Sequence, residues 1–195
     1  MYRLILIILL AGGVVLGGAL ISGSQAQGPP GKVRLPEVVP NNADEAKVRR
    51  GLEIAPLPLN LRGRNRALVG FGSYIVNAQG DCNGCHTVDF DPYLPGGNPF
   101  FGEPEQIDPD KYLVGGSFFG PFRSRNLRPH ADTGLPAGFT FEEFLHVIRT
   151  GEDLKNLHPG ISPLLQAMPW PSFRNMTDRD ILAIYEYLRA LPPAP

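Results

Sequence analysis

The residues with the clearest chemistry are two cysteines and a histidine that lie within five consecutive positions. Cys82 and Cys85 are the only cysteines in the chain, and His86 follows directly. A two-residue gap lets both thiols form thioether bonds to the two vinyl groups along one edge of a porphyrin. The adjacent imidazole then reaches the iron from one face as its proximal ligand. The spacing therefore predicts one covalently attached haem c, with His86 bound to the iron.

Two other kinds of site use a Cys-x-x-Cys pair, and the residues around Cys82 and Cys85 weigh against both. A thiol–disulfide redox centre would leave His86 without a role, and the setting does not resemble the strand–motif–helix of a thioredoxin unit. A structural zinc site usually takes four ligands at close spacing, whereas only these three lie together. Haem attachment is the interpretation that uses all three residues.

A methionine is predicted as the sixth ligand of the iron. Met168 precedes Pro169, which favours an extended backbone and presents the thioether from a stiff loop. Met176 instead precedes the helix-capping residue Thr177, where it would pack against Ile181 as a hydrophobic staple. We therefore predict Met168 as the distal ligand, with ordinary core filling as its alternative role.

Histidines are the competing distal ligands. His130 and His158 lie in predicted loops and could reach an iron, with His158 the second candidate after Met168. His146 falls off the apolar face of its predicted helix and is expected in solvent. A His/Met pair is the usual arrangement for electron transfer and raises the reduction potential. With both axial positions filled, the iron moves single electrons, whereas an open distal position would make a ligand sensor.

The haem propionates need partners, because buried carboxylates require hydrogen bonds. Asn126 and Trp170 are the candidates that we assign to the cofactor site. Arg123 and Arg125 could also reach the propionates, although arginines on a loop are often simply solvated.

Three segments with apolar residues at helical spacing are the elements that position these groups. They are Ala67–Gln79, a helix capped by Thr140 and stopped by Gly151, and a helix capped by Thr177 and ended by Pro192. A short helix is expected over Asp44–Ile54. The loop 87–139 is rich in Gly and Pro, and a loop of that length needs a surface to pack on. We predict an all-α domain wrapped around one covalent haem, with long loops.

The N-terminus is typical of an export signal. Arg3 precedes the apolar stretch Leu4–Ile21, and Ser24-Gln25-Ala26 offers a cleavage site. The alternative is an uncleaved membrane anchor, since 18 residues is the lower limit for a span. We expect an exported, periplasmic protein, either soluble or tethered to the cytoplasmic membrane.

Composition and charge complete the predicted organisation. Residues 1–26 are the signal or anchor, 27–65 a Pro-rich extension, and 66–195 the haem domain. The formal net charge of −1, with no basic cluster, excludes a nucleic-acid-binding role. The expected partners are redox proteins that donate and accept electrons.

Several segments resemble known haem modules. Tyr74–Thr87 resembles the haem-attachment segment of class I-type bacterial cytochromes c. Asn126-Leu127-x-Pro129 followed by Thr133-Gly134 resembles a segment of the single-haem modules in cytochrome subunits of membrane-associated alcohol and sugar dehydrogenases. The segments that follow in those modules resemble Phe139–Leu145 with Arg149–Asp153, and Met168–Phe173 with Met176–Asp180. The likeness spans about residues 67–192.

This resemblance implies a small cytochrome c-like fold in which Cys82 and Cys85 carry the thioethers, His86 is proximal and Met168 distal. It also implies that the first and last helices cross near the haem, with Gly72 and Tyr185 as contact residues.

The sequence also departs from these modules. The dehydrogenase subunits carry several haem motifs and this chain has one, while Arg128 and His130 replace a Thr and an acidic residue. The predicted function is a single-haem cytochrome that carries one electron at a time and is not itself an enzyme. The alternative is a cytochrome subunit of a multi-subunit periplasmic dehydrogenase.

Overall fold

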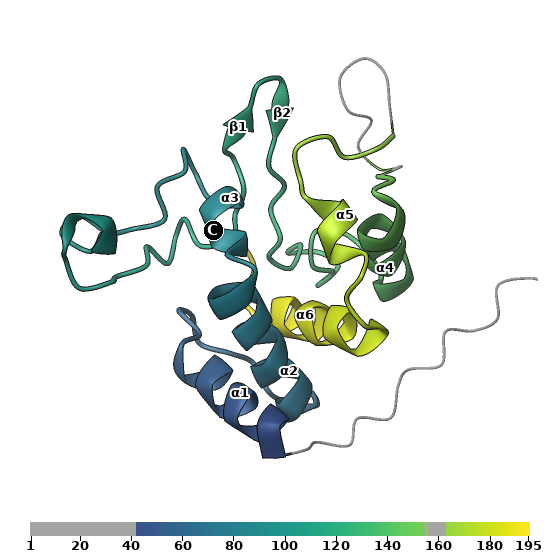
Figure 1. Cartoon of the computed structure of the whole chain (residues 1–195), viewed down its shortest axis with the longest axis horizontal. Coiled ribbons are helices and arrows are strands. Elements are labelled where there is room, and N and C mark those ends of the chain that lie inside the picture. Colours follow the sequence, from purple (N-terminus) through teal and green to yellow (C-terminus); the bar gives the residue numbers. More distant parts are fainter. Residues whose placement is uncertain (1–41, 154, 156–162) are drawn as a thin grey trace, which may run out of the picture. The chain divides into compact units, whose positions relative to one another are not determined.

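Helices dominate the computed structural model, which describes residues 42–153, 155 and 163–195. The helices are α1 (Asn42–Glu53), α2 (Arg66–Tyr74), the π-helix η1 (Ile75–Gln79), α3 (Cys82–Cys85), the 3-10 helix η2 (Pro99–Phe101), α4 (Phe141–Thr150), α5 (Trp170–Phe173) and α6 (Asp178–Ala190). Strands β1 (Phe118–Phe119) and β2 (Phe122–Arg123) form an antiparallel hairpin with Phe119 opposite Phe122. The predicted all-α class is therefore confirmed (Figure 1).

The predicted starts of α4 and α6 and the predicted end of α4 are confirmed by their caps, and α2 begins at a cap that was not predicted. The Asn65 side chain accepts hydrogen bonds from the first turn of α2. Thr140 and Thr177 each form a capping box, at the starts of α4 and α6. Gly151 ends α4 with a φ of 76°, a left-handed conformation that glycine adopts without strain.

The segment predicted as one helix over 67–79 changes its winding near its end. After Tyr74 the chain continues as the π-helix η1, closed by a bond from the Gly80 N–H to the Ile75 carbonyl at 2.7 Å. The wider turn carries Asn77, whose side-chain amide donates to Tyr187 and whose Oδ1 accepts from Tyr112. A π turn of this kind is common beside functional sites, and this one directly precedes Cys82.

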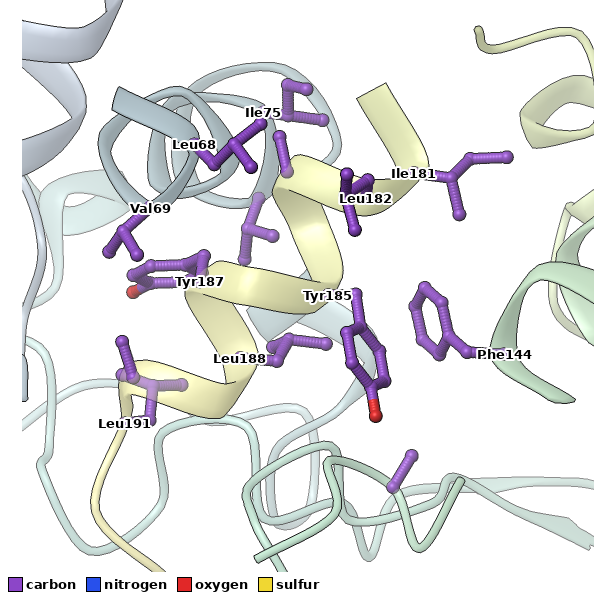
Figure 2. Packing of buried hydrophobic residues seen from close by; sticks show 14 of the residues in the cluster. Leu68, Val69, Ile75, Phe144, Ile181, Leu182, Tyr185, Tyr187, Leu188 and Leu191 are labelled. Atoms are coloured by element: carbon purple, nitrogen blue, oxygen red, sulfur yellow. The ribbon is translucent and has the colours of Figure 1, made fainter. Parts of the chain in front are cut away.

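Helices α2 and α6 cross at Gly72. A β-carbon on Gly72 would lie 1.8 Å from the carbonyl oxygen of Ala183, so the two backbones pack closer than any side chain permits. The implied contact role of Gly72 is thus correct. Tyr185 faces another way: its ring lies against Phe144 of α4, while Tyr187 points to the opposite side of α6, beside Val69 (Figure 2).

Helix α1 packs on α2 through a second pair of glycines. A β-carbon on Gly51 would lie 1.9 Å from the Gly70 carbonyl oxygen, and one on Gly70 would meet the Val48 carbonyl at 2.6 Å. Ser73 of α2 donates to the Gly51 carbonyl at 2.6 Å. This part of the predicted Pro-rich extension therefore contributes to the folded unit.

The long loop between α3 and α4 is tied by hydrogen bonds to the segment that follows α6. Arg128 is buried and donates to the carbonyls of Pro109, Pro192 and Pro193, which joins the loop to the end of the chain. Among the described residues, no helix combines the length and the apolar character needed to cross a membrane. The predicted signal or anchor over residues 1–26 lies outside the described residues.

Candidate haem site

The Cys-x-x-Cys-His motif forms one tight helical turn. Asp81, just before α3, adopts a left-handed backbone with a φ of 42°, a conformation that Asp tolerates better than most residues. The Asp81 carboxylate lies over Gly84, where a β-carbon would come within 2.7 Å of Oδ2. A side chain at position 84 would have to displace this carboxylate, while Cys82 and Cys85 occupy one short turn with His86 at its end.

The His86 imidazole is oriented by the backbone of Arg125. Its Nδ1 lies 2.7 Å from the Arg125 carbonyl oxygen. A carbonyl can only accept, so Nδ1 carries the proton and Nε2 keeps a free lone pair. Burial lowers the pKa of His86, the Arg125 carbonyl raises it and the Arg125 charge lowers it. The neutral ring is in the state that a metal ligand needs, with an orienting partner on its other nitrogen.

Both motif thiols are protonated at neutral pH in the protein alone. Burial, with the nearby Asp81 and Cys85, raises the pKa of the Cys82 thiol to about 12. Burial and Asp81 also raise the pKa of Cys85, which is exposed. Both cysteines are free. Within the described residues, no three His, Cys, Asp or Glu side chains converge to hold a metal ion.

An apolar cavity of about 720 Å³ opens beside the motif. Its wall includes Cys82, Cys85 and His86 of the motif and, from much later in the sequence, the loop that carries Met168. The apolar part of the wall comes from η1, the β-hairpin, α4, α5 and α6: Ile75, Val76, Phe119, Phe122, Phe144, Val147, Ile148, Phe173, Ile184 and Leu188. The volume lies within the usual range for cofactor pockets.

Two methionines line this cavity. Met168 was predicted as the distal ligand and Met176 as a hydrophobic staple, and both residues line the same space. Met176 is fixed through its backbone, whose carbonyl accepts from Arg149 at 2.6 Å. Met168 lies on the loop before α5, where its carbonyl accepts from the Trp170 N–H at 2.8 Å. The cavity thus offers one imidazole and two thioethers.

Trp170 contacts the loop that carries Met168 without lining the cavity. Its indole N–H donates to the Leu165 carbonyl at 3.0 Å, and its ring covers Gly151, where a β-carbon would lie 2.3 Å from the ring. The haem contact predicted for Trp170 stays a prediction, and the observed contacts give it a positioning role.

Polar residues also line the cavity. Asn126, Arg123 and Arg125 all line it. The Asn126 Oδ1 accepts from the Arg128 N–H at 2.9 Å, which leaves its amide group to donate elsewhere. The guanidinium of Arg125 lies 4.4 Å from the centre of the Phe139 ring and donates to the Ala137 carbonyl at 3.0 Å. The Arg125 guanidinium is thus engaged within the protein, and the amide of Asn126 and the guanidinium of Arg123 are the donors that suit the carboxylates of a propionate-bearing group.

Asp153 is the residue that sequence reasoning missed. Its carboxylate is buried and forms an ion pair with Arg125. The pair links the end of α4 to the loop whose carbonyl orients His86. Asp153 belongs to the Arg149–Asp153 segment, whose resemblance to a stretch of known haem modules could have drawn attention to it. Its partner Arg125 lies 28 positions away, so the ion pair could not be predicted from the segment alone.

The competing histidines lie elsewhere. His130 is exposed and faces Asp132 at 3.9 Å. His146 is also exposed, as predicted, with its Nε2 2.9 Å from Glu152. Neither lines the cavity. His158 lies outside the described residues, so its candidacy stays a prediction.

A second missed feature is a buried polar cluster near Cys82. The Tyr112 hydroxyl lies 2.7 Å from the Tyr187 hydroxyl and donates to Asn77 at 2.5 Å. Burial raises the pKa of both tyrosines, so both stay protonated. The cluster joins the long loop to α6 and η1, which fixes the turn from which α3 starts.

The chain is similar in sequence to several curated proteins. No protein-family model matches the chain. The chain is 32% identical over 125 residues to the gluconate 2-dehydrogenase cytochrome c subunit of Pantoea cypripedii, which covers 63% of the chain and 23% of that protein. It is 33% identical over 123 residues to the cytochrome c subunit of the quinone alcohol dehydrogenase of Gluconacetobacter polyoxogenes, covering 62% and 21%. It is similar to cytochrome c subunits.

A third relative is one of the subunits of the nicotinate dehydrogenase of Pseudomonas putida, 32% identical over 144 residues, which cover 72% of the chain and 10% of that protein. The chain thus spans less than a quarter of the length of these relatives. The sequence similarity therefore covers one part of each of these longer proteins.

The donor set fits a c-type haem. Two thiols and a neutral imidazole line an apolar cavity, and two thioethers and the polar side chains of Asn126, Arg123 and Arg125 line it as well. Soft sulfur and imidazole ligands suit haem iron, and an apolar wall suits the porphyrin.

Proposed function

We propose that this chain is a single-haem c-type cytochrome that carries one electron at a time between redox proteins. Cys82 and Cys85 would hold the porphyrin through thioethers, His86 would be the proximal ligand and Met168 the distal one. The cytochrome domain would comprise residues 66–195, with α1 of the extension 27–65 packed on it, and a signal or anchor would occupy residues 1–26.

One observation carries this proposal. His86, whose Nδ1 is bonded to the Arg125 carbonyl, lines the same apolar cavity as Met168. Haem bound there would supply a one-electron iron couple. The protein's own residues then have separable roles: Arg125 orients the imidazole, the aromatic wall excludes water, and Trp170 supports the methionine loop.

The similarity to dehydrogenase subunits favours a second, narrower form of this function. Relatives named as cytochrome c subunits of gluconate and alcohol dehydrogenases, and one named as the cytochrome subunit of a fructose dehydrogenase, match the chain. A cytochrome subunit would receive electrons from a separate catalytic chain in the periplasm. In this form the donor is a permanent partner and not a diffusing one.

Expression of the full chain with export and c-type haem maturation tests the proposal. We expect one haem per chain that survives denaturation, measured by intact mass and by the pyridine haemochrome spectrum. Cys82→Ala/Cys85→Ala should lose the covalent haem. A matured chain that keeps two free thiols and no haem would contradict the proposal.

Carbon monoxide separates a carrier from a ligand sensor. With His86 and Met168 both bound, the reduced protein should bind the gas slowly and weakly, because the thioether must first leave. Fast, tight binding to the intact protein would instead indicate an open distal position.

A further inference from the structure

The segment 88–111, which we call the acidic arm, follows the haem-attachment motif in the sequence and extends away from the helices. In Figure 1 it is the teal segment at the left, which carries η2 away from the helices. At its tip Phe100 and Phe101 are 86% and 80% exposed. Two adjacent phenylalanines this exposed form an apolar feature that monomeric proteins seldom display without a partner.

The tip of the acidic arm is held in one shape by its own hydrogen bonds. Asn98 caps η2 through its side chain, which accepts from the Phe100 N–H at 2.9 Å. Glu103 accepts from the Asn98 N–H at 2.8 Å, and Gly102 turns the chain with a φ of 80°. A bridge between Tyr93 and Ile107 closes the base. The two phenyl rings are therefore presented by an ordered turn, which lowers the entropy cost of binding.

Carboxylates outnumber cations along the acidic arm. The sequence of the acidic arm holds six carboxylates, Asp89, Asp91, Glu103, Glu105, Asp108 and Asp110, against one cation, Lys111. Lys111 faces back to Asp91 at 3.0 Å and Asp108 at 3.9 Å, and Arg128 lies against the base of the arm, where it donates to the Pro109 carbonyl and interacts with Asp110. The outer part of the acidic arm, with the exposed Glu105 beside the tip, is therefore negative.

We propose that the acidic arm docks a partner protein whose surface offers an apolar pocket rimmed by lysine or arginine. Aromatic anchors seated in such a pocket carry much of the affinity of an interface, and complementary charge at the rim speeds the encounter. The net negative charge disfavours an anionic membrane surface, and it disfavours a second copy of the same arm. This inference concerns a surface apart from the cavity and does not depend on the cofactor.

Photo-crosslinking in the producing cell identifies the partner. The full chain carries p-benzoylphenylalanine at position 101, and a control places it at the exposed Arg62. We expect an adduct at position 101 that is absent at position 62, with its site on the partner mapped by mass spectrometry to apolar residues flanked by Lys or Arg. A lipid adduct, a self-adduct or no adduct would overturn the proposal.

Binding of the identified, purified partner then tests the chemistry. Phe100→Ser/Phe101→Ser should weaken the Kd at least about tenfold, while Phe118→Ser, which removes an exposed ring from the β-hairpin, should not. Asp89→Asn/Glu105→Gln should slow association at low salt and lose that effect at high salt. Equal losses for the Phe100/Phe101 and Phe118 variants would overturn a role specific to the acidic arm.

Two further measurements test whether the acidic arm instead binds a second copy of the chain or a lipid membrane. Sedimentation of the wild-type chain should show no dimer that depends on Phe100 and Phe101, and vesicles of phosphatidylcholine and phosphatidylglycerol should not retain it through these rings. Either result reversed would overturn the proposal. The haem spectrum and thermal midpoint of each variant, expected to be unchanged, separate a docking defect from a failure of folding or of haem attachment.

Discussion

The Nδ1 atom of His86 lies 2.7 Å from the backbone carbonyl oxygen of Arg125, and the guanidinium of the same arginine is paired with the buried carboxylate of Asp153. One residue thus orients the proximal imidazole through its backbone and ties this position to the end of α4 through its side chain. The orientation of His86 depends on residues 39 and 67 positions away in the sequence.

Asp153→Asn should destabilise the protein. The substitution leaves the guanidinium of Arg125 partly buried without its counter-charge, and breaking a buried ion pair from one side costs about 3 kcal/mol. Urea unfolding of the two proteins, with equal m-values, measures the difference. A loss below about 1 kcal/mol would mean that water replaces the carboxylate at no great cost.

The matched control for this pair is Arg125→Met/Asp153→Asn. Removing both charges avoids the unpaired cation, so the double variant should lose less stability than Asp153→Asn alone. The His86 bond should persist in it, because the acceptor is the backbone of residue 125 and not its side chain.

The two cavity methionines should differ in their effect on the haem spectrum. Met168→Ala should abolish the iron–thioether charge-transfer band of the oxidised protein and lower its reduction potential, since a His/Met pair raises that potential. Met176→Leu conserves volume, so it should leave the band intact and cost less than about 1.5 kcal/mol. The reverse pattern would assign Met176 as the distal ligand.

Gly72→Ala should destabilise the fold although alanine favours helices. Helix propensity alone would stabilise the variant by about 1 kcal/mol. The added methyl group would instead lie 1.8 Å from the Ala183 carbonyl oxygen, forcing α2 and α6 apart at a net cost of at least about 2 kcal/mol. Thermal unfolding followed by circular dichroism measures this, and an unchanged or raised midpoint would show that the helices separate freely.

Acid should weaken the protein partly through Glu143. Lys155 donates to its carboxylate at 2.6 Å and the Thr140 N–H at 2.8 Å, and both bonds lower the pKa of Glu143. A carboxylate with a lowered folded-state pKa stabilises the protein above its ordinary value of 4.5, and this contribution is lost as the pH falls through the folded-state value.

Glu143→Gln should therefore flatten the fall in stability below pH 4.5, as measured by urea midpoints across the acid range. Glu142→Gln removes an exposed carboxylate from the same turn and serves as the comparison. A parallel acid slope in wild type and Glu143→Gln would show that the Lys155 and Thr140 bonds do not persist in solution.

Local signals were sufficient for the helices and for the motif. The Thr140 and Thr177 capping boxes, and Gly151 at the end of α4, act within a few residues, so their patterns are legible in the sequence. The helical segment predicted over 67–79 lies where it was expected, but its last five residues form a π-helix, which was not predicted. The π turn at its end follows from the contacts of Asn77 with Tyr112 and Tyr187, which lie far away in the chain.

The sequence by itself determined the chemistry available to this protein: two thiols and an imidazole at haem spacing, two methionines, and helices with defined ends. Only the tertiary structure decided which groups share a cavity, that Asp153 meets Arg125, and that Trp170 contacts the loop that carries Met168. The physical reason is that caps and motif spacing are local, whereas packing and buried ion pairs depend on which distant segments the fold brings together.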